Sequence, residues 1–345
     1  GHDDMIGHME HYYDPNDFNR VIYHSRSTDA DKRIGVLLKD ADLLLEKCGN
    51  DFEEITEYQL FVRCLSEQTI VEDGKRRLRT KEDGGMNSSI LQNPSDPDAT
   101  YRKKAGKEHR GYAANVEESV GKNGSVVTDY QLDSNNKSDS EFFQEHVEKI
   151  GPQEEKTIIS ADGAYSGEEN TELAAKNNID LVTTDLTGRD VDPVMGAFEL
   201  NEDGTRVLHC PAGNAPRSNW YNKATGIINI SFERDKCANC PFAMHCKPKI
   251  FKKVSKLTVS RKMVNRALTQ ARMNTEQFKL LARIRNGVET VPSALKNIYN
   301  VNHMPVRGKI PCKHFFGSKI AALNFRKLLR FRQGTGHYGQ NPLLA

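Results

Sequence analysis

Two stretches of the chain place acidic residues where they could hold a metal ion. Asp162 follows the apolar run 157–161, which has the pattern of a short buried strand, and Gly163 comes directly after it. Reactive groups of α/β sheets usually lie at strand ends, because the loop beyond the strand is free to bind a ligand. An Asp before a Gly is also a common turn or helix-cap residue. Asp162 alone therefore leaves both interpretations open.

A second acid lies on a polar helical stripe. Arg285, Glu289 and Lys296 are spaced by four and seven residues, which places them on one side of an α-helix. Such a stripe is either a surface ion-pair ladder or a metal ligand flanked by phosphate-binding cations. Glu289 is one of only two acids after residue 246, which favours the ligand. Pro292 predicts a kink or a new helix within the stripe.

The run 161–166 (Ala-Asp-Gly-Ala-Tyr-Ser), followed far downstream by R-x3-E-x6-K, resembles bacterial DDE-type insertion-sequence transposases. Of that family's Y-(2)-R-(3)-E-(6)-K pattern, Arg285, Glu289 and Lys296 match, and Ala282 stands in place of the Tyr. The segment 96–112 is also similar to the family's approach to its second strand. The resemblance covers roughly residues 90–335.

This resemblance implies metal-dependent cleavage and strand transfer at the ends of the element. Asp162 would be the second and Glu289 the third catalytic acid, together holding two Mg²⁺ ions, which prefer oxygen ligands. The family's first acid precedes its helical insertion, so we expect it outside this N-terminally truncated chain. Asp98 is a weaker substitute for it. The expected DNA contacts are Arg285, Lys296, Tyr165, Arg326, Lys327 and Arg330.

The implied partners are double-stranded DNA, at transposon ends and target, and a second copy of the chain, because two ends must be brought together. An alternative is a catalytically inactive, zinc-stabilised DNA-binding remnant. Both hypotheses predict DNA binding, and only the first predicts cutting and joining.

Four of the seven cysteines lie close together in the sequence. Cys210 precedes Cys237, Cys240 and Cys246, a set that could supply four thiolates to a tetrahedral structural Zn²⁺. His245 is a possible substitute ligand. The segment has few apolar residues, which makes a metal staple reasonable. A redox pair at positions 237 and 240, or scattered thiols, are the alternatives.

Charge is distributed unevenly along the chain. The formal net charge is +2, yet residues 247–345 hold 21 Lys and Arg against Glu276 and Glu289 alone. A one-sided basic surface is typical of nucleic-acid binding. The sequence holds no membrane-length apolar run and no signal-peptide pattern, so we expect a cytoplasmic, nucleoid-associated protein. The single Trp220 and Tyr221 are interpreted as buried aromatics rather than base-stacking ones.

The pattern of elements predicts what must position these residues. Residues 15–65 read as helices, one capped by Ser27 or Thr28 and ending at Gly49, and 66–100 as an irregular linker. Strands are expected at 111–118 and 125–132, joined by the turn 121–124, and at 157–161 and 179–184. Capping boxes of Ser138 with Glu141 and of Ser166 with Glu169 predict a helix beginning at each serine, the second ending near Asn177. Helical periodicity covers 260–300, and a basic amphipathic helix covers 319–332, with Ile320, Leu323, Leu328 and Leu329 on its apolar side.

We therefore predict an α/β protein, with an RNase H-like mixed-sheet core, a helical N-terminal region and a Cys-rich zinc-binding insertion. The predicted boundaries are 1–90 for the helical region and linker, 91–185 for the first part of the core, 186–258 for the insertion, and 259–345 for the C-terminal helices and basic DNA-binding tail.

Overall fold

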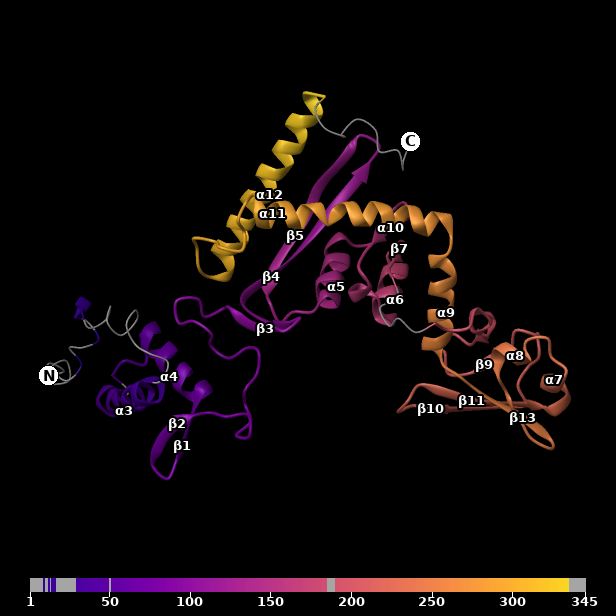
Figure 1. Ribbon diagram of the computed structural model, residues 1–345, viewed down its shortest axis with the longest axis horizontal. Coiled ribbons are helices and arrows are strands. Elements are labelled where there is room, and N and C mark those ends of the chain that lie inside the picture. The colour runs from indigo at the N-terminus through magenta and orange to yellow at the C-terminus, as the bar shows by residue number, and fades with distance from the viewer. Residues whose placement is uncertain are drawn as a thin grey trace. The chain divides into compact units, whose positions relative to one another are not determined.

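The computed structural model describes residues 9, 12, 14–16, 29–49, 51–184 and 190–334. They fall into two compact units, whose helices and strands are labelled in Figure 1. The first draws on Gly1–Glu117, Asp129–Lys137 and Asn300–Leu323, and the second on Glu118–Thr128, Ser138–Tyr299 and Asn324–Ala345. Helices and strands are mixed in both units, so the predicted α/β class is confirmed. Within the described residues no helix is both long and apolar enough to cross a membrane.

Two helices of the first unit occupy the predicted helical region. They are α3 (Ala30–Cys48) and α4 (Thr56–Gln68). Helix α3 ends at Gly49 as predicted, where φ is 47°, a left-handed value that glycine adopts without strain. Its N-cap residue is Asp29; the predicted caps Ser27 and Thr28 lie outside the described residues.

Residues 66–100 are more ordered than predicted. Strands β1 (Thr69–Glu72) and β2 (Lys75–Leu78) form an antiparallel hairpin, and its turn residues Asp73 and Gly74 both have positive φ. An Asp-Gly turn between short strands is a strong hairpin signal. The prediction of an irregular linker is wrong for this part, because the charged side chains of β2 hide its strand pattern.

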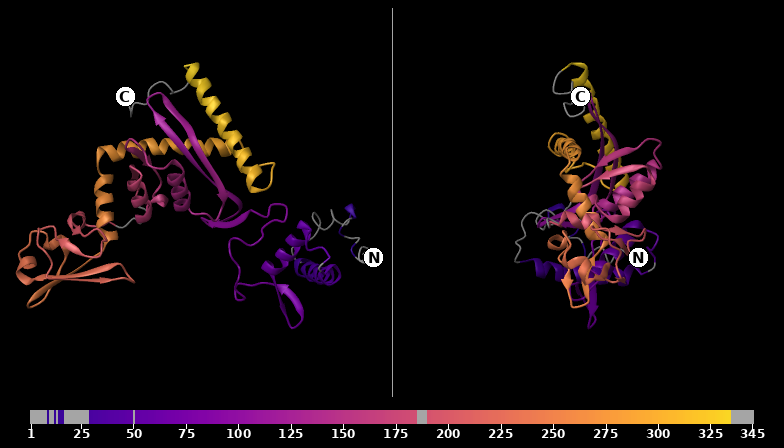
Figure 2. Two further views of the ribbon diagram at one scale, coloured as in Figure 1. Left: turned by 180° about the vertical axis from the view of Figure 1, so that it is seen from behind. Right: turned by 90° about the vertical axis from the view of Figure 1, so that its right-hand side faces the viewer.

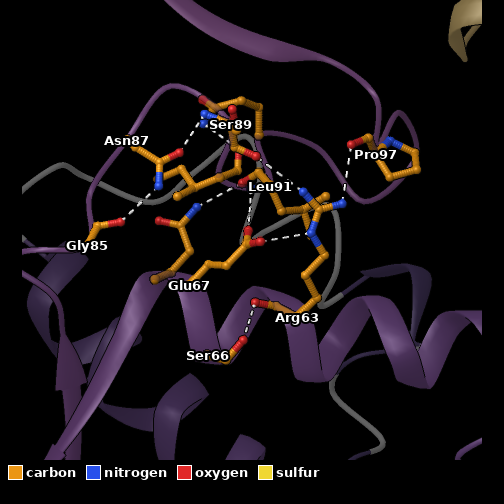
Figure 3. Close-up of polar contacts among 11 residues, drawn as sticks. Arg63, Ser66, Glu67, Gly85, Asn87, Ser89, Leu91 and Pro97 are labelled. Atoms are coloured by element: carbon orange, nitrogen blue, oxygen red, sulfur yellow. Dashed lines mark hydrogen bonds and ion pairs between the residues drawn. The ribbon is translucent and has the colours of Figure 1, made fainter.

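The segment after the hairpin is tied to α4 by a polar network (Figure 3). The Arg63 guanidinium donates to the carbonyls of Ser89 and Pro97 at 3.2 and 3.4 Å and pairs with Glu67 at 2.9 Å. Glu67 in turn accepts from the Leu91 N–H at 2.6 Å. These side chains satisfy backbone groups of a segment that has few strand partners of its own.

A three-stranded sheet follows, in the order β3-β4-β5. Its strands are β3 (Thr100–Lys104), β4 (Lys107–Gly121) and β5 (Gly124–Ser134). The predicted strands 111–118 and 125–132 are confirmed and extend further, and the turn between them is where it was predicted. In the first unit, buried Asp96 accepts from the Tyr112 hydroxyl at 2.5 Å and from the Gly308 N–H at 3.1 Å.

The second unit contains the expected α-β-α-β succession. It runs α5 (Asp139–Ile150), β6 (Thr157–Ser160), the short 3₁₀ helix η3 (Gly163–Tyr165), α6 (Glu168–Lys176) and β7 (Ile179–Val182). Strands β6 and β7 pair in parallel. Phe143, Val147, Ala174 and Ile179 form a small buried core beneath them. Within the described residues β6-β7 and β3-β4-β5 are separate hydrogen-bonded sheets, so a single RNase H-like sheet stays a prediction.

The two predicted capping boxes have different outcomes. At α5, Ser138 accepts from the Glu141 N–H and the Glu141 side chain accepts from the Ser138 N–H, so this box is confirmed. At α6 the N-cap residue is Gly167, with no side-chain cap bond. Ser166 instead donates its hydroxyl to the Gly163 carbonyl at 2.6 Å. The capping box predicted at Ser166 and Glu169 is wrong, because the Ser166 side chain is bonded to the preceding 3₁₀ turn.

The cysteine-containing region is a folded subdomain rather than a loop-rich segment. Its sheet has the order β10-β11-β13-β12, built from β10 (Ser218–Asn222), β11 (Ile227–Glu233), β12 (Lys249–Ile250) and β13 (Val254–Val259). Its shorter elements are η4 (Pro193–Ala197), β8 (Glu199–Leu200), β9 (Val207–His209), α7 (Arg234–Ala238) and α8 (Ala243–Cys246). Nine buried residues form its core, including Ile228, Ile230 and Phe232. The expectation that this region lacks apolar residues to hold it together is therefore wrong.

The stretch 260–300, predicted to be helical, is divided into three helices. They are α9 (Arg261–Met273), α10 (Glu276–Val288) and α11 (Thr290–Asn297). The last helix, α12 (Lys309–Arg332), begins before the predicted residue 319. Ile320 and Leu323 are buried in it as expected, whereas Leu328 and Leu329 are exposed.

Candidate active site

Asp162 lies directly after β6, in a turn fixed by its own backbone. Its carboxylate accepts from the Gly163 N–H at 2.5 Å and caps η3. The turn is held down by Tyr165, whose ring meets Phe143 edge-on with 6.4 Å between centroids. Burial, and then the charges of Asp139 and Asp162, raise the pKa of Tyr165 to about 12. Asp162 thus combines the strand-end position and the cap role that the sequence left as alternatives.

Arg285 brings the two predicted acids together. Its Nη1 lies 3.9 Å from Asp162 Oδ1 and 4.0 Å from Glu289 Oε1, so the two carboxylates are no farther apart than the sum of these distances. The Arg285 side chain is 23% exposed, against 59% for Asp162 and 71% for Glu289. A shielded guanidinium therefore lies between two carboxylates that face solvent.

The helix that carries Arg285 reaches Asp162 because α10 packs against β6. The Nε atom of Arg285 is buried without a hydrogen-bond partner in the described part of the chain. A buried donor without a partner is costly, so the protein alone does not fully satisfy this guanidinium. An anion bound beside it would supply the missing acceptors.

Glu289 stands at the junction of two helices. It is at once the C-cap of α10 and the N-cap of α11, with helical backbone angles, φ −55° and ψ −21°. Figure 1 and the left view of Figure 2 show α10 and α11 running on in nearly one direction. Pro292 lies in the first turn of α11. The N–H groups of a first helical turn have no partner within the helix, so a proline is tolerated there. The stripe Arg285–Glu289 therefore survives the proline, and Lys296 follows, exposed, in the last turn of α11.

The other predicted DNA contacts lie in varied surroundings. Lys327 is largely buried and forms an ion pair with Glu118, which is more deeply buried, and its Nζ lies 3.2 Å from the Ser125 hydroxyl. Arg326 is half-buried and Arg330 is exposed on the same helix. The ring of Tyr165 is committed to the core through Phe143. Only Arg285 of the predicted cations lies against the acids in the contacts described.

Four cysteines gather around one cavity. Cys210, Cys237, Cys240 and Cys246 all line it, with Phe198 and Phe232 among the apolar walls. Burial, and then the neighbouring Cys240, Cys210 and Cys237, raise the pKa of Cys246 to about 11. His245 points elsewhere, its Nδ1 lying 2.8 Å from Asp192.

No three His, Cys, Asp or Glu side chains in the described ranges stand together as a metal site. The four thiols line one cavity, and the two carboxylates lie beside one guanidinium. In neither set are the side chains close enough together to coordinate one metal ion as they stand. The chemistry of each set still fits its expected ion, thiolates for Zn²⁺ and carboxylates for Mg²⁺.

The sequence interpretation missed the position of Trp220. It was interpreted as buried, yet it is 61% exposed on β10, while Tyr221 packs against the subdomain core. The alternation Ile228, Ile230, Phe232 on the neighbouring strand was the signal available, because one face of a sheet alternates with the other.

Comparison with known proteins identifies a related family of domains. Residues 209–329 match the family model described as a transposase DDE domain. The matched range contains the four clustered cysteines, Arg285, Glu289 and Lys296, and begins after Asp162. No curated protein and no solved structure matches the chain.

Proposed function

We propose that this chain cuts and joins DNA at the ends of an insertion sequence, because residues 209–329 match the family model described as a transposase DDE domain. The observation that carries the proposal is Arg285, held between Asp162 and Glu289 by contacts of 3.9 and 4.0 Å. One acid comes from a strand end and the other from a helix junction, and a cation between them suits a phosphodiester substrate.

The two acids suit Mg²⁺ because it is a hard cation that keeps several waters and takes one or two carboxylates along with substrate phosphate. Asp162 and Glu289 would hold it, and both are exposed enough to admit water and DNA. Bound Mg²⁺ supplies activation of the attacking oxygen and charge stabilisation of the leaving oxygen.

Arg285 would orient the substrate. Its guanidinium can bind a phosphate oxygen while staying near both carboxylates, and the helix beneath it keeps the fork in place. Lys296 and Arg330, both exposed, would contact phosphates farther along the duplex, and Arg326 would do so from the same helix as Arg330. Lys327 can contact a phosphate only if its ion pair with Glu118 breaks. Tyr165 would contribute indirectly, because its ring packs against Phe143 and holds the turn that contains Asp162.

The four cysteines would bind one structural Zn²⁺. They enclose a single cavity beneath the sheet, and all four positions are taken by protein thiols, which leaves no open site for catalysis. Two copies of the chain would act together on paired DNA ends. Because its substrate is chromosomal DNA, such a protein would act on the bacterial nucleoid.

The test is cleavage and strand transfer on duplex DNA carrying both ends of the encoding element, with Mg²⁺. Glu289→Gln and Asp162→Asn should each lower both activities by at least about 10²-fold, the typical effect of losing one preorganised charged group. Glu276→Gln is the matched control, since it removes the only other acid after residue 246, at the exposed start of α10. Duplex binding by the parent chain without any cleavage would instead support the inactive DNA-binding remnant.

A further inference from the structure

The outward face of the cysteine-containing sheet differs sharply from its inward face. Ile228, Ile230 and Phe232 of β11 point into the core. The alternate residues, Asn229 and Ser231, lie on the opposite side of the sheet. Cross-strand pairing then fixes which residues of the other strands share that outward face.

Two rows of side chains cross the outward face in register. The first row is Trp220, Asn229 and Thr258, from β10, β11 and β13. The second row is Ser218, Ser231, Lys256 and Lys249, from all four strands. We call these seven residues the outer platform.

Trp220 gives the outer platform an aromatic surface. It is 61% exposed, so much of its large apolar ring faces solvent instead of packing in the core. A tryptophan exposed to this degree on a flat sheet is a ready partner for another planar group. Asn229 and Thr258, in the same row, can donate and accept hydrogen bonds at the edges of such a group.

The second row favours an anion. Lys249 and Lys256 are both exposed and lie directly opposite each other in the β12-β13 ladder. Like charges in that position repel, and a phosphate between them would remove the repulsion. Lys256 also lies 5.5 Å above the exposed Phe251 ring. Across residues 217–256 there are nine Lys and Arg against Glu233 and Asp235, which lie at the end of β11 and the start of α7.

From this arrangement we propose that the outer platform binds unpaired DNA, with a base stacked on Trp220 and a neighbouring phosphate held by Lys256 and Lys249. The pattern of one stacking ring beside a cationic row is that of sheet surfaces that bind single strands. A duplex cannot use it fully, because paired bases hide their faces inside the helix. The inference rests on the proposed function for its choice of DNA as the nucleic acid.

Trp220 is the only tryptophan of the chain, so its fluorescence reports on this surface alone. The chain is titrated without Mg²⁺ with a mixed-sequence single-stranded DNA of about 16 nucleotides, the upper end of known sheet-platform footprints, and with the same sequence as duplex. We expect strong quenching by the single strand and little by the duplex. Because no cleavage is involved, this result is independent of whether the acids cut DNA.

Variants are compared by anisotropy of the labelled oligonucleotide. Trp220→Ala should weaken single-strand binding about 5- to 150-fold, while Trp220→Phe should retain most of it. Lys256→Gln should lower the salt dependence by about 0.7 in the logarithmic slope, the value for one phosphate contact on a single strand. Lys262→Gln, a change outside the sheet, is the control. Equal quenching by duplex, or unchanged affinity of a folded Trp220→Ala variant, would overturn the proposal.

Discussion

The acid site and the cysteine-containing sheet are held together in opposite ways. Asp162, Arg285 and Glu289 come from separate elements and meet at the surface, over a core of four buried residues. The four-stranded sheet contributes to a core cluster of nine buried residues, which the neighbouring shorter elements and α9 complete. The acid site therefore presents exposed charged groups above a small apolar core, whereas the cysteine-containing subdomain encloses a larger one.

This contrast separates where reactivity lies from where stability lies. Exposed carboxylates around a shielded guanidinium contribute little to folding, since exposed ion pairs are worth well under about 1 kcal/mol. They remain available for a substrate. Buried isoleucines contribute a great deal to folding and nothing directly to chemistry. Substitutions in the two regions should therefore affect different measurements.

The largest effect is expected from Arg285→Ala. It removes the cation that lies within 4.0 Å of both acids in the described part of the chain, so strand transfer should fall by about 10²- to 10³-fold. Stability should change little. Arg283→Ala, two residues away on the same helix and exposed, is the matched control for charge. Arg285→Lys should restore only part of the rate, because an ammonium lacks the planar fork. Full activity in Arg285→Ala would remove this residue from the proposed site.

In the sheet the corresponding test is Ile228→Ala. Ile228 is 0% exposed, and its truncation should lower the free energy of unfolding by about 2–5 kcal/mol through lost burial and a cavity. Ile227→Ala, at the exposed neighbouring position, should cost under about 1 kcal/mol. Urea unfolding followed by circular dichroism measures both. If the two variants unfold at the same urea concentration, the sheet core is not what stabilises this subdomain.

Metal removal should give an intermediate effect. If the four thiols bind zinc as proposed, the protein purified under reducing conditions holds about one zinc per chain, and Cys240→Ser loses it. The melting temperature should then fall by several degrees without complete unfolding, because the apolar core of the sheet remains. Cys64→Ser, on α4, is the control and should keep its zinc. A folded chain that is purified without zinc, and whose stability a chelator does not change, would contradict the zinc site.

Sequence reasoning succeeded where the signal was local and periodic. The strands at β4, β5, β6 and β7 follow directly from alternation and short apolar runs, and the helix of Arg285 and Glu289 follows from spacing. The approach of Arg285 to Asp162 could be predicted only through family resemblance. The two residues are far apart in the sequence, and their contact depends on α10 packing against β6.

It failed where long-range pairing determines the outcome. The cysteine-containing region looked poor in apolar residues because its core is assembled from short strands separated by polar turns. Trp220 was misplaced for the same reason, since only the register with Asn229 assigns it to the outward face. Ser166 resembled a helix cap, but the 3₁₀ turn after Asp162 had already engaged it.

The smallest expected effect distinguishes the two predicted capping boxes in the scaffold of the acid site. Ser138→Ala should lower the free energy of unfolding by about 1 kcal/mol, because it removes the acceptor for the Glu141 N–H at the start of α5. Glu141→Ala and Glu169→Ala both remove an acid from a first helical turn, so both lose a similar helix-dipole contribution. Only Glu141 also accepts from a cap backbone N–H, at 2.7 Å, so Glu141→Ala should be the more destabilising of the pair. Equal effects in urea unfolding would mean that the box at Ser138 adds nothing beyond the dipole, and that the scaffold of the acid site relies on its small core alone.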